Sequence, residues 1–293
     1  MKKLKVVLPG KPLIIFKFRV FLENMNMSKS KFSALTTFNL NKHSYGVEMI
    51  NSFFANWPNE VTLTAFIENS SAIDDSAVKP KIIIRDFNKS IPEYQKFVEK
   101  FKEKEKYTDD FRFNVFRFAH KVYAIAAALK NVKTKYLIWL DADIKTYKKL
   151  PLEFLDTLIS ANSYMSYLGR ENISLKHLSY SECGFLIFNT KHPIHKRFWE
   201  DMMKMYDDGD LFNEKEWHDS YIFDVVRKNL EKEKKIENFN ISMIDNFVLK
   251  TDDHVFISSV LGKYMDHKKG NRKKTKWSHE LLYRIKKEKE YNS

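Results

Sequence analysis

Short apolar runs alternate along the chain with longer segments that mix apolar and charged residues. The short runs are rich in β-branched and aromatic residues, a composition typical of strands. They predict strands over residues 32–38, 61–67, 81–85, 136–140, 164–168 and 184–188. The longer segments predict helices over residues 45–57, 90–106, 113–129, 152–160, 195–208 and 214–231. Strands that alternate with helices predict an α/β protein in which helices flank a mostly parallel sheet.

The run Tyr136–Leu140 (YLIWL) contains no charged position. A continuous apolar run of this kind is typical of a strand buried on both faces of a parallel sheet. We find neither an internal repeat nor a linker that divides the chain. We therefore predict a single α/β domain over residues 31–270, with an N-terminal extension over 1–30 and a basic C-terminal tail over 271–293.

Composition excludes several classes of protein. Hydrophobic residues make up 43% and aromatic residues 15% of the 293 positions, too many for a disordered chain. The single cysteine, Cys183, excludes a disulfide framework and a cysteine-based zinc site. Neither GxGxxG nor GxxxxGK[ST] occurs, so a dinucleotide-binding site or P-loop is disfavoured. Because there is no apolar run of about 18 residues and no signal-peptide core, we predict a cytoplasmic protein, soluble or peripherally bound to a membrane.

Two acidic residues follow the most apolar run directly, in the order Asp141-Ala142-Asp143. On an extended chain residues i and i+2 point the same way, so both carboxylates project together from the strand end. Ligands of open α/β sheets bind at this end of the strands. A divalent cation such as Mn²⁺ or Mg²⁺ would relieve the repulsion between the two carboxylates. The alternative is a solvated turn that carries two acids.

A second candidate motif, HxxGxxK, spans His267, Gly270 and Lys273. A neutral imidazole is a metal ligand, and a glycine lets the backbone approach an anion closely. Lysine and arginine side chains in the same segment supply charge for a pyrophosphate. The alternative is a basic tail without a specific ligand.

Taken in order, the strand-borne DxD and the later HxxGxxK resemble the GT-A class of nucleotide-sugar glycosyltransferases over roughly residues 31–275. The likeness is greatest to glycosyltransferase family 8 and to related small viral and bacterial enzymes. It implies a Rossmann-like GT-A domain and Mn²⁺ or Mg²⁺ as cofactor. It also implies metal ligands at Asp141, Asp143 and His267. Gly270 and Lys273, together with Asp141, would then contact the nucleotide sugar.

Further residues are candidates for the nucleotide site of such an enzyme. The segment Thr36-Thr37-Phe38 ends the first regular strand, where a base could stack on the phenylalanine ring; an ordinary strand end is the alternative. Glu68 follows the second strand and could meet a ribose hydroxyl, but a solvated acid is the favoured interpretation. Arg117 and Lys121 lie four residues apart and share one face of a helix. Because much of that helix is apolar, we expect these two cations to face a diphosphate or a site carboxylate; a surface stripe is the alternative.

Two acids are candidates for catalysis. Glu182 leads the strand over 184–188, which borders the donor sugar and the acceptor in similar enzymes. Asp219 shares a helix face with Ile222 and Phe223, and a carboxylate among core residues is costly unless it is paired or used. The resemblance implies transfer of a sugar from a nucleoside-diphosphate sugar, with UDP the first nucleotide to consider, to a glycan or another hydroxyl acceptor. Family 8 enzymes retain the anomeric configuration, so we expect retention.

The net charge of +13 leaves other partners open. From Lys263 to the end, nine lysines and two arginines face four acids, more than half of the net charge. A nucleic-acid-binding or nucleotidyl-transfer protein is therefore an alternative function. It is disfavoured because the charge gathers at one end and no nucleic-acid-binding motif is found, so we expect no nucleic-acid partner. A peripheral membrane contact through Trp277, Tyr283 and the lysine pair 286–287 is compatible with either function.

Overall fold

The computed structural model describes residues 3–6, 14–17, 30–40, 45–69, 81–107, 109–170, 180–234, 236–244, 254–270, 273 and 275–291. Near the N-terminus β1 (Lys3–Val6) pairs antiparallel with β2 (Ile14–Lys17). Most of the predicted extension over 1–30 lies outside the described residues, so its boundary stays a prediction.

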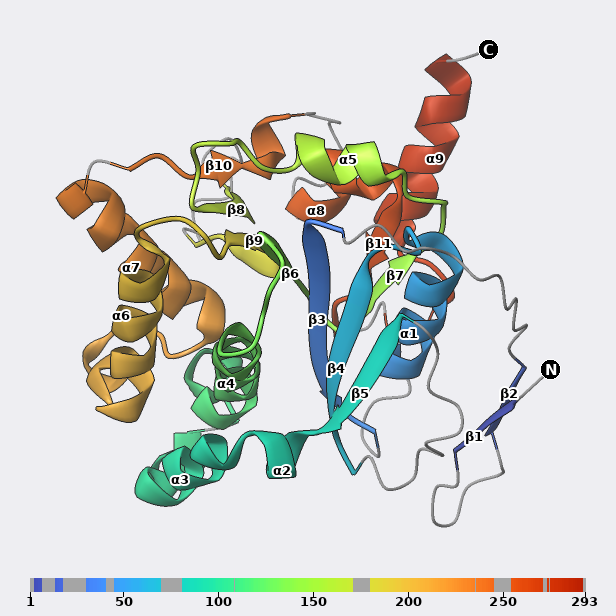
Figure 1. Ribbon diagram of the computed structural model, residues 1–293. Coiled ribbons are helices and arrows are strands. Elements are labelled where there is room, and N and C mark those ends of the chain that lie inside the picture. The colour runs from blue at the N-terminus through green and yellow to red at the C-terminus, as the bar shows by residue number, and fades with distance from the viewer. Residues whose placement is uncertain are drawn as a thin grey trace.

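A seven-stranded sheet forms the centre of the protein (Figure 1). Its strands are β3 (Phe32–Asn39), β4 (Thr62–Glu68), β5 (Ile82–Asp86), β6 (Tyr136–Leu140), β8 (Met165–Leu168), β9 (Glu182–Asn189) and β10 (Phe239–Asn240). They lie in the order β10-β8-β9-β6-β3-β4-β5. Neighbours pair parallel except at β9, which is antiparallel to both β6 and β8. The predicted α/β class and mostly parallel sheet are confirmed.

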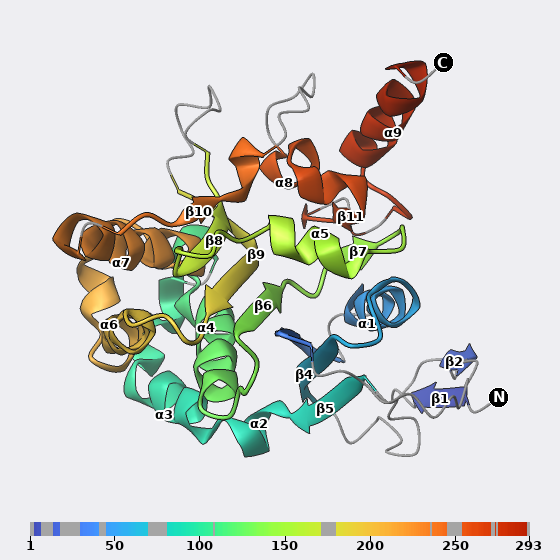
Figure 2. The ribbon, with the colours of Figure 1, turned by 45° about the horizontal axis from the view of Figure 1, so that its top comes forward.

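Helices flank this sheet on both faces. The longer ones are α1 (Tyr45–Asn56), α3 (Pro92–Lys100), α4 (Val115–Leu129), α6 (His195–Asp207), α7 (Asp219–Lys234) and α9 (His279–Tyr291). The short ones are α2 (Phe87–Ser90), α5 (Leu152–Thr157) and α8 (Val255–Ser258). Figures 1 and 2 show α4, α6 and α7 on one side of the sheet and α1 on the other. Among the described residues no helix is both long and apolar enough to cross a membrane.

Strand β6 shows how the sheet divides two hydrophobic cores. Tyr136, Ile138 and Leu140 belong to the core beneath α1, α5, α8 and α9. The intervening Leu137 and Trp139 belong to the core beneath α4, α6 and α7. Successive strand residues point to opposite faces, and both faces here are covered, so every position of β6 is buried. This is the arrangement that the uninterrupted apolar run predicts.

Two predicted helices differ from the structure in their extent. The helix predicted over 90–106 is broken: Ser90 ends α2, Pro92 begins α3, and a 3₁₀ segment, η3 (Lys102–Tyr107), follows α3. The helix predicted from residue 214 begins instead at Asp219. Before it, the backbone N–H of Trp217 donates to the carbonyl of Arg112 (2.7 Å), and this tertiary bond holds the segment outside the helix.

A separate two-stranded sheet brings the C-terminal region to the end of β6. In it β7 (Ile144–Thr146) pairs antiparallel with β11 (Met265–His267), with His267 opposite Ile144. The carboxylate of the buried Asp266 accepts bonds from the backbone N–H (2.7 Å) and the hydroxyl (2.6 Å) of Ser278, which precedes α9. Helix α9 is thereby fixed to the strand that carries His267.

Candidate metal centre and adjoining cleft

The two acids of the DxD motif lie where β6 ends. Asp141 donates its backbone N–H to the carbonyl of Gly184 (2.8 Å), which continues the pairing with β9 for one more residue. Its carboxylate accepts a hydrogen bond from the indole of Trp139 (2.7 Å). Ile144 then donates its N–H to the carbonyl of Asp141 (3.0 Å), so the chain turns and carries Asp143 back toward Asp141.

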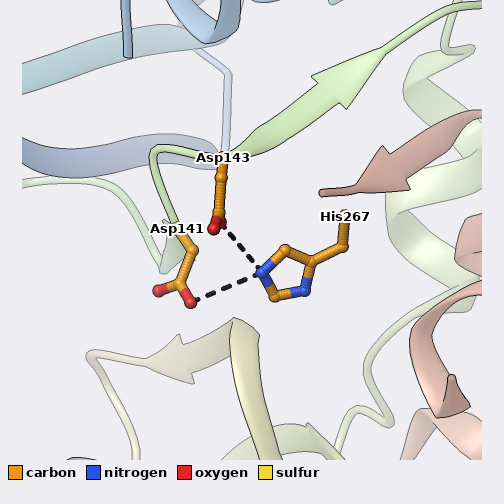
Figure 3. A group of neighbouring side chains, drawn as sticks. All are labelled: Asp141, Asp143 and His267. Carbon is orange, nitrogen blue, oxygen red and sulfur yellow. Dashed lines mark ion pairs between the residues drawn. The ribbon is translucent and has the colours of Figure 1, made fainter. Parts of the chain in front are cut away.

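His267 joins these acids from β11. Its Nε2 lies 2.9 Å from Oδ1 of Asp143 and 3.6 Å from Oδ2 of Asp141 (Figure 3). One ligand atom from each of the three residues lies within 4.8 Å of the others. Neither ring nitrogen of the buried His267 has a hydrogen-bond partner among the described residues. Two carboxylates and an orphaned imidazole fit a divalent cation that accepts oxygen and nitrogen ligands, such as Mn²⁺ or Mg²⁺.

A glycine on β9 makes room for the imidazole. A Cβ at Gly184 would lie 2.3 Å from Cε1 and 2.8 Å from Nδ1 of His267. Both separations are shorter than a normal van der Waals contact, so any side chain here would push His267 away. The position of His267, the third candidate ligand, therefore depends on Gly184 in another strand. The sequence motifs did not single out this glycine.

Two lysines neutralise the acidic pair. Nζ of Lys273 lies 2.9 Å from Oδ2 of Asp143, and Nζ of Lys121 lies 3.3 Å from Oδ1 of Asp141. Burial opposes the ionisation of Asp143, but His267 and Lys273 outweigh it and hold its pKa below the usual range of a carboxyl group. Burial likewise disfavours the charged form of Lys121, but its carboxylate neighbours raise its pKa above the usual range of an ammonium group. The charged forms of Asp143 and Lys121 are thus both favoured.

Asp219 is the second partner of Lys121. Its Oδ2 lies 2.7 Å from the ammonium group, and both side chains are nearly buried. Lys121 also donates to the backbone carbonyl of Cys183. Lys121 was expected to face a diphosphate or a site carboxylate, and it contacts two carboxylates, those of Asp141 and Asp219. Asp219 packs beside Ile222 and Phe223 on the buried face of α7, as its position in the sequence predicted.

The acidic pair opens onto a cleft of about 590 Å³. It is lined by Thr37, Phe38, Asn39, Tyr45, Glu68, Tyr94, Glu105, Asn114, Phe116, Arg117, Phe118, His120, Lys121, Trp139, Asp141, Ala142, Asp143, Asp219 and Lys273. Most of the predicted site residues are in this lining, Glu68 among them. Four are not: Thr36, Glu182, His267 and Gly270.

The first strand meets the cleft differently from the sequence expectation. Thr36 is wholly buried, and it is Thr37 that lines the cleft. The ring of Phe38 is only 4% exposed and packs against Gly46, where a Cβ would lie 2.4 Å from it. Little of this ring faces the cleft, although Phe38 is part of the lining. Base stacking on Phe38 stays a prediction.

Polar groups line one end of the cleft beside Glu68. Nε2 of His120 lies 3.2 Å from Oε1 of Glu68, and Nδ1 lies 3.3 Å from the hydroxyl of Thr37. The ring of His120 stacks on Phe87 at a centroid distance of 3.6 Å. The sequence analysis missed His120, although it lies directly before Lys121 on the same helix. It also missed Trp139, two residues before Asp141 and so on the same side of β6.

The remaining candidates lie around the cleft. Arg117 is exposed at its lining. Gly270 has a φ of +56°, a left-handed conformation that favours glycine, and it is exposed in the loop after β11. Trp277 and Tyr283, expected at a membrane surface, are partly buried against the core, so their rings are not freely presented to a membrane.

Sequence comparison gives no assignment, because neither a family model nor a curated protein matches the chain. Solved glycosyltransferase structures are similar in fold. Mouse xyloside xylosyltransferase 1, in its apo form, has a TM-score of 0.45 at 11% identity over 78% of this chain and 93% of that one. The galactosyltransferase LgtC, solved with donor and acceptor sugar analogues, has a TM-score of 0.38 at 14% identity over 66% of this chain and 69% of that one.

GlyE, a glycosyltransferase from Streptococcus pneumoniae solved in its apo form, has a TM-score of 0.45 at 10% identity. The match covers 68% of this chain and 44% of GlyE, so this chain spans less than half of that protein. Each of these similarities is one of fold alone, at a TM-score below 0.5 and low sequence identity.

Proposed function

We propose that this protein is a metal-dependent glycosyltransferase that moves a sugar from a nucleoside-diphosphate sugar, with UDP the first nucleotide to test, to a glycan or another hydroxyl acceptor. One observation carries the proposal: Asp141, Asp143 and His267 converge at the end of β6, beside a cleft with lysine and arginine in its lining. A diphosphate needs this combination, because a cation and fixed positive charges together neutralise it.

Each residue then has a distinct task. The ion held by Asp141, Asp143 and His267 would act as a Lewis acid on the leaving diphosphate. Lys273 and Arg117 supply further positive charge where the diphosphate oxygens gain negative charge as the glycosidic bond breaks. Gly270 lets the loop backbone approach the phosphates.

Asp219 is proposed as the acid nearest the reacting carbon. The transition state at the sugar resembles an oxocarbenium ion, which a nearby carboxylate stabilises. The ammonium group of Lys121 lies 2.7 Å from this carboxylate and holds it beside the cleft. If configuration is retained, as we propose, the leaving phosphate accepts the proton of the acceptor hydroxyl, and Asp219 is not needed as a base.

Calorimetry of UDP binding with and without Mn²⁺ tests the proposal. We expect wild-type protein to bind UDP only with Mn²⁺ and the Asp143→Ala variant to lose this binding. Asp156→Ala, an exposed acid on α5 that pairs with Lys31, is the matched control and should bind as the wild type does. If UDP, GDP, CDP and dTDP all fail to bind wild-type protein in the presence of Mn²⁺ or of Mg²⁺, the glycosyltransferase assignment is wrong.

A further inference from the structure

Glu182 is separated from the cleft although it begins the strand beside the DxD motif. Its side chain is 3% exposed and does not contribute to the cleft lining. Two cations enclose one of its oxygens: Oε2 lies 3.2 Å from a guanidinium nitrogen of Arg170 and accepts a bond from the ammonium group of Lys269. A carboxylate so enclosed is not placed to contact a substrate in the cleft.

The other oxygen of Glu182 faces the proposed metal ligand. Oε1 accepts the backbone N–H of Gly184 (3.1 Å) and lies 3.5 Å from Nδ1 of His267. The opposite nitrogen of the same ring, Nε2, points to Asp143 and Asp141. His267 therefore lies between the acidic pair on one side and a single buried carboxylate on the other.

We propose that Glu182 is a positioning residue for metal binding, which acts through His267 and not on the substrate. The inference rests on the proposed metal-dependent function and deepens it. A metal takes the lone pair of Nε2, so the ring proton must reside on Nδ1. Oε1 of Glu182 lies 3.5 Å from Nδ1, and although no hydrogen bond joins them in this structure, it is placed to accept that proton once a metal holds Nε2. The contact selects the tautomer that can bind a metal, fixes the ring plane, and makes the imidazole a better donor.

The cations around Glu182 support this role. A buried carboxylate is costly unless it is paired, and Lys269 and Arg170 both pair with Oε2 of Glu182. Lys269 comes from the same loop as the HxxGxxK motif, and Arg170 lies two residues after the end of β8. Because both bind Oε2, they leave Oε1 for Gly184 and His267. The two cations thus hold the carboxylate of Glu182 in place beside Nδ1 of His267.

Mn²⁺ affinity of the full chain, measured by the loss of the free-ion electron paramagnetic resonance signal without nucleotide, tests the inference. We expect Glu182→Met to weaken Mn²⁺ binding by about 10- to 100-fold, the usual effect of losing such a partner. Glu182→Gln keeps an oxygen acceptor and should fall between this variant and the wild type. The control is Glu231→Gln, a partly buried carboxylate paired with Arg227 (2.8 Å), which should change stability but not Mn²⁺ affinity.

A double-mutant cycle with His267→Ala separates the possible causes. If Glu182 acts through the imidazole, Glu182→Met has no further effect on Mn²⁺ affinity once His267 is removed. An equal loss with and without His267 would overturn the inference, because Glu182 would then act on the ion directly through its charge. Wild-type affinity in both Glu182 variants would overturn it as well. If wild-type protein does not bind Mn²⁺, the proposed function fails, and the inference fails with it.

Discussion

Removing the ammonium group of Lys273 should strengthen metal binding while it weakens nucleotide binding. Lys273 lies 2.9 Å from Asp143, so a metal ion must displace it or share that carboxylate with it. Two unit charges at this distance attract each other by about 1.4 kcal/mol in bulk water and by about 6 kcal/mol at an effective dielectric constant of ~20. Because the lysine side chain is 22% exposed and solvent screens it, we expect the lower value to apply. This corresponds to about a tenfold change in affinity.

The assay is Mn²⁺ titration of the Lys273→Met variant, first without and then with UDP. Without nucleotide we expect Mn²⁺ to bind about tenfold more tightly than to the wild type. With Mn²⁺ present we expect UDP to bind about tenfold or more weakly, because a charge-assisted bond to phosphate is lost. Lys268→Met is the matched control, since that ammonium group binds Glu48 (3.3 Å) and the carbonyl of Thr275 (3.0 Å). Unchanged or weaker Mn²⁺ binding by Lys273→Met without UDP would refute the reasoning.

Three further predictions concern stability, each checked by urea unfolding. Gly184→Ala would place a Cβ 2.3 Å from the ring of His267, so we expect a loss of about 1–3 kcal/mol and weaker Mn²⁺ binding; unchanged stability and affinity would contradict the steric account. Ser278→Ala removes one of two donors to Asp266 and should cost about 2 kcal/mol, whereas a cost below ~0.5 kcal/mol would show that α9 is not fixed there. Burial and then Lys149 lower the pKa of Lys81 from 10.5 to about 8, which destabilises the fold while the lysine is charged. The free energy of unfolding of the wild type should therefore rise by about 3 kcal/mol relative to that of Lys81→Met as pH rises from 8 to 10.5. A difference between the two proteins that does not change with pH would contradict this.

The sequence predicted those parts of the fold that local signals determine. The run YLIWL is apolar at every position because both faces of β6 are covered, and its limits were predicted without error. The two acids at its end follow from the same run, since a strand end and a spacing of two place both carboxylates together. The start of α7 was wrong because a tertiary hydrogen bond from Trp217 to Arg112 holds the preceding residues outside the helix.

The site was predicted less completely, because its geometry depends on contacts between distant segments. Phe38 lies on the correct strand, but Gly46 admits α1 against its ring and buries it. Glu182 and Asp219 are both buried acids beside strands or helices, and nothing local distinguishes them. The cations that contact each acid distinguish them. Lys121 pairs with Asp219, which lines the cleft, whereas Arg170 pairs with Glu182, which lies outside the lining.

The pairing of β7 with β11 determines when, during synthesis of the chain, the three candidate metal ligands can come together. The acids 141 and 143 leave the ribosome long before His267, which is held in place only when β11 adds to β7. A chain that is unfinished, or clipped before residue 265, would keep the acidic pair without its third ligand. We expect such a fragment to bind metal poorly and so to lack the proposed activity. A bound ion in turn would tie residues 143 and 267 together and add to the free energy of unfolding by mass action. The metal ion would then bind only after β11 has been synthesised and has paired with β7.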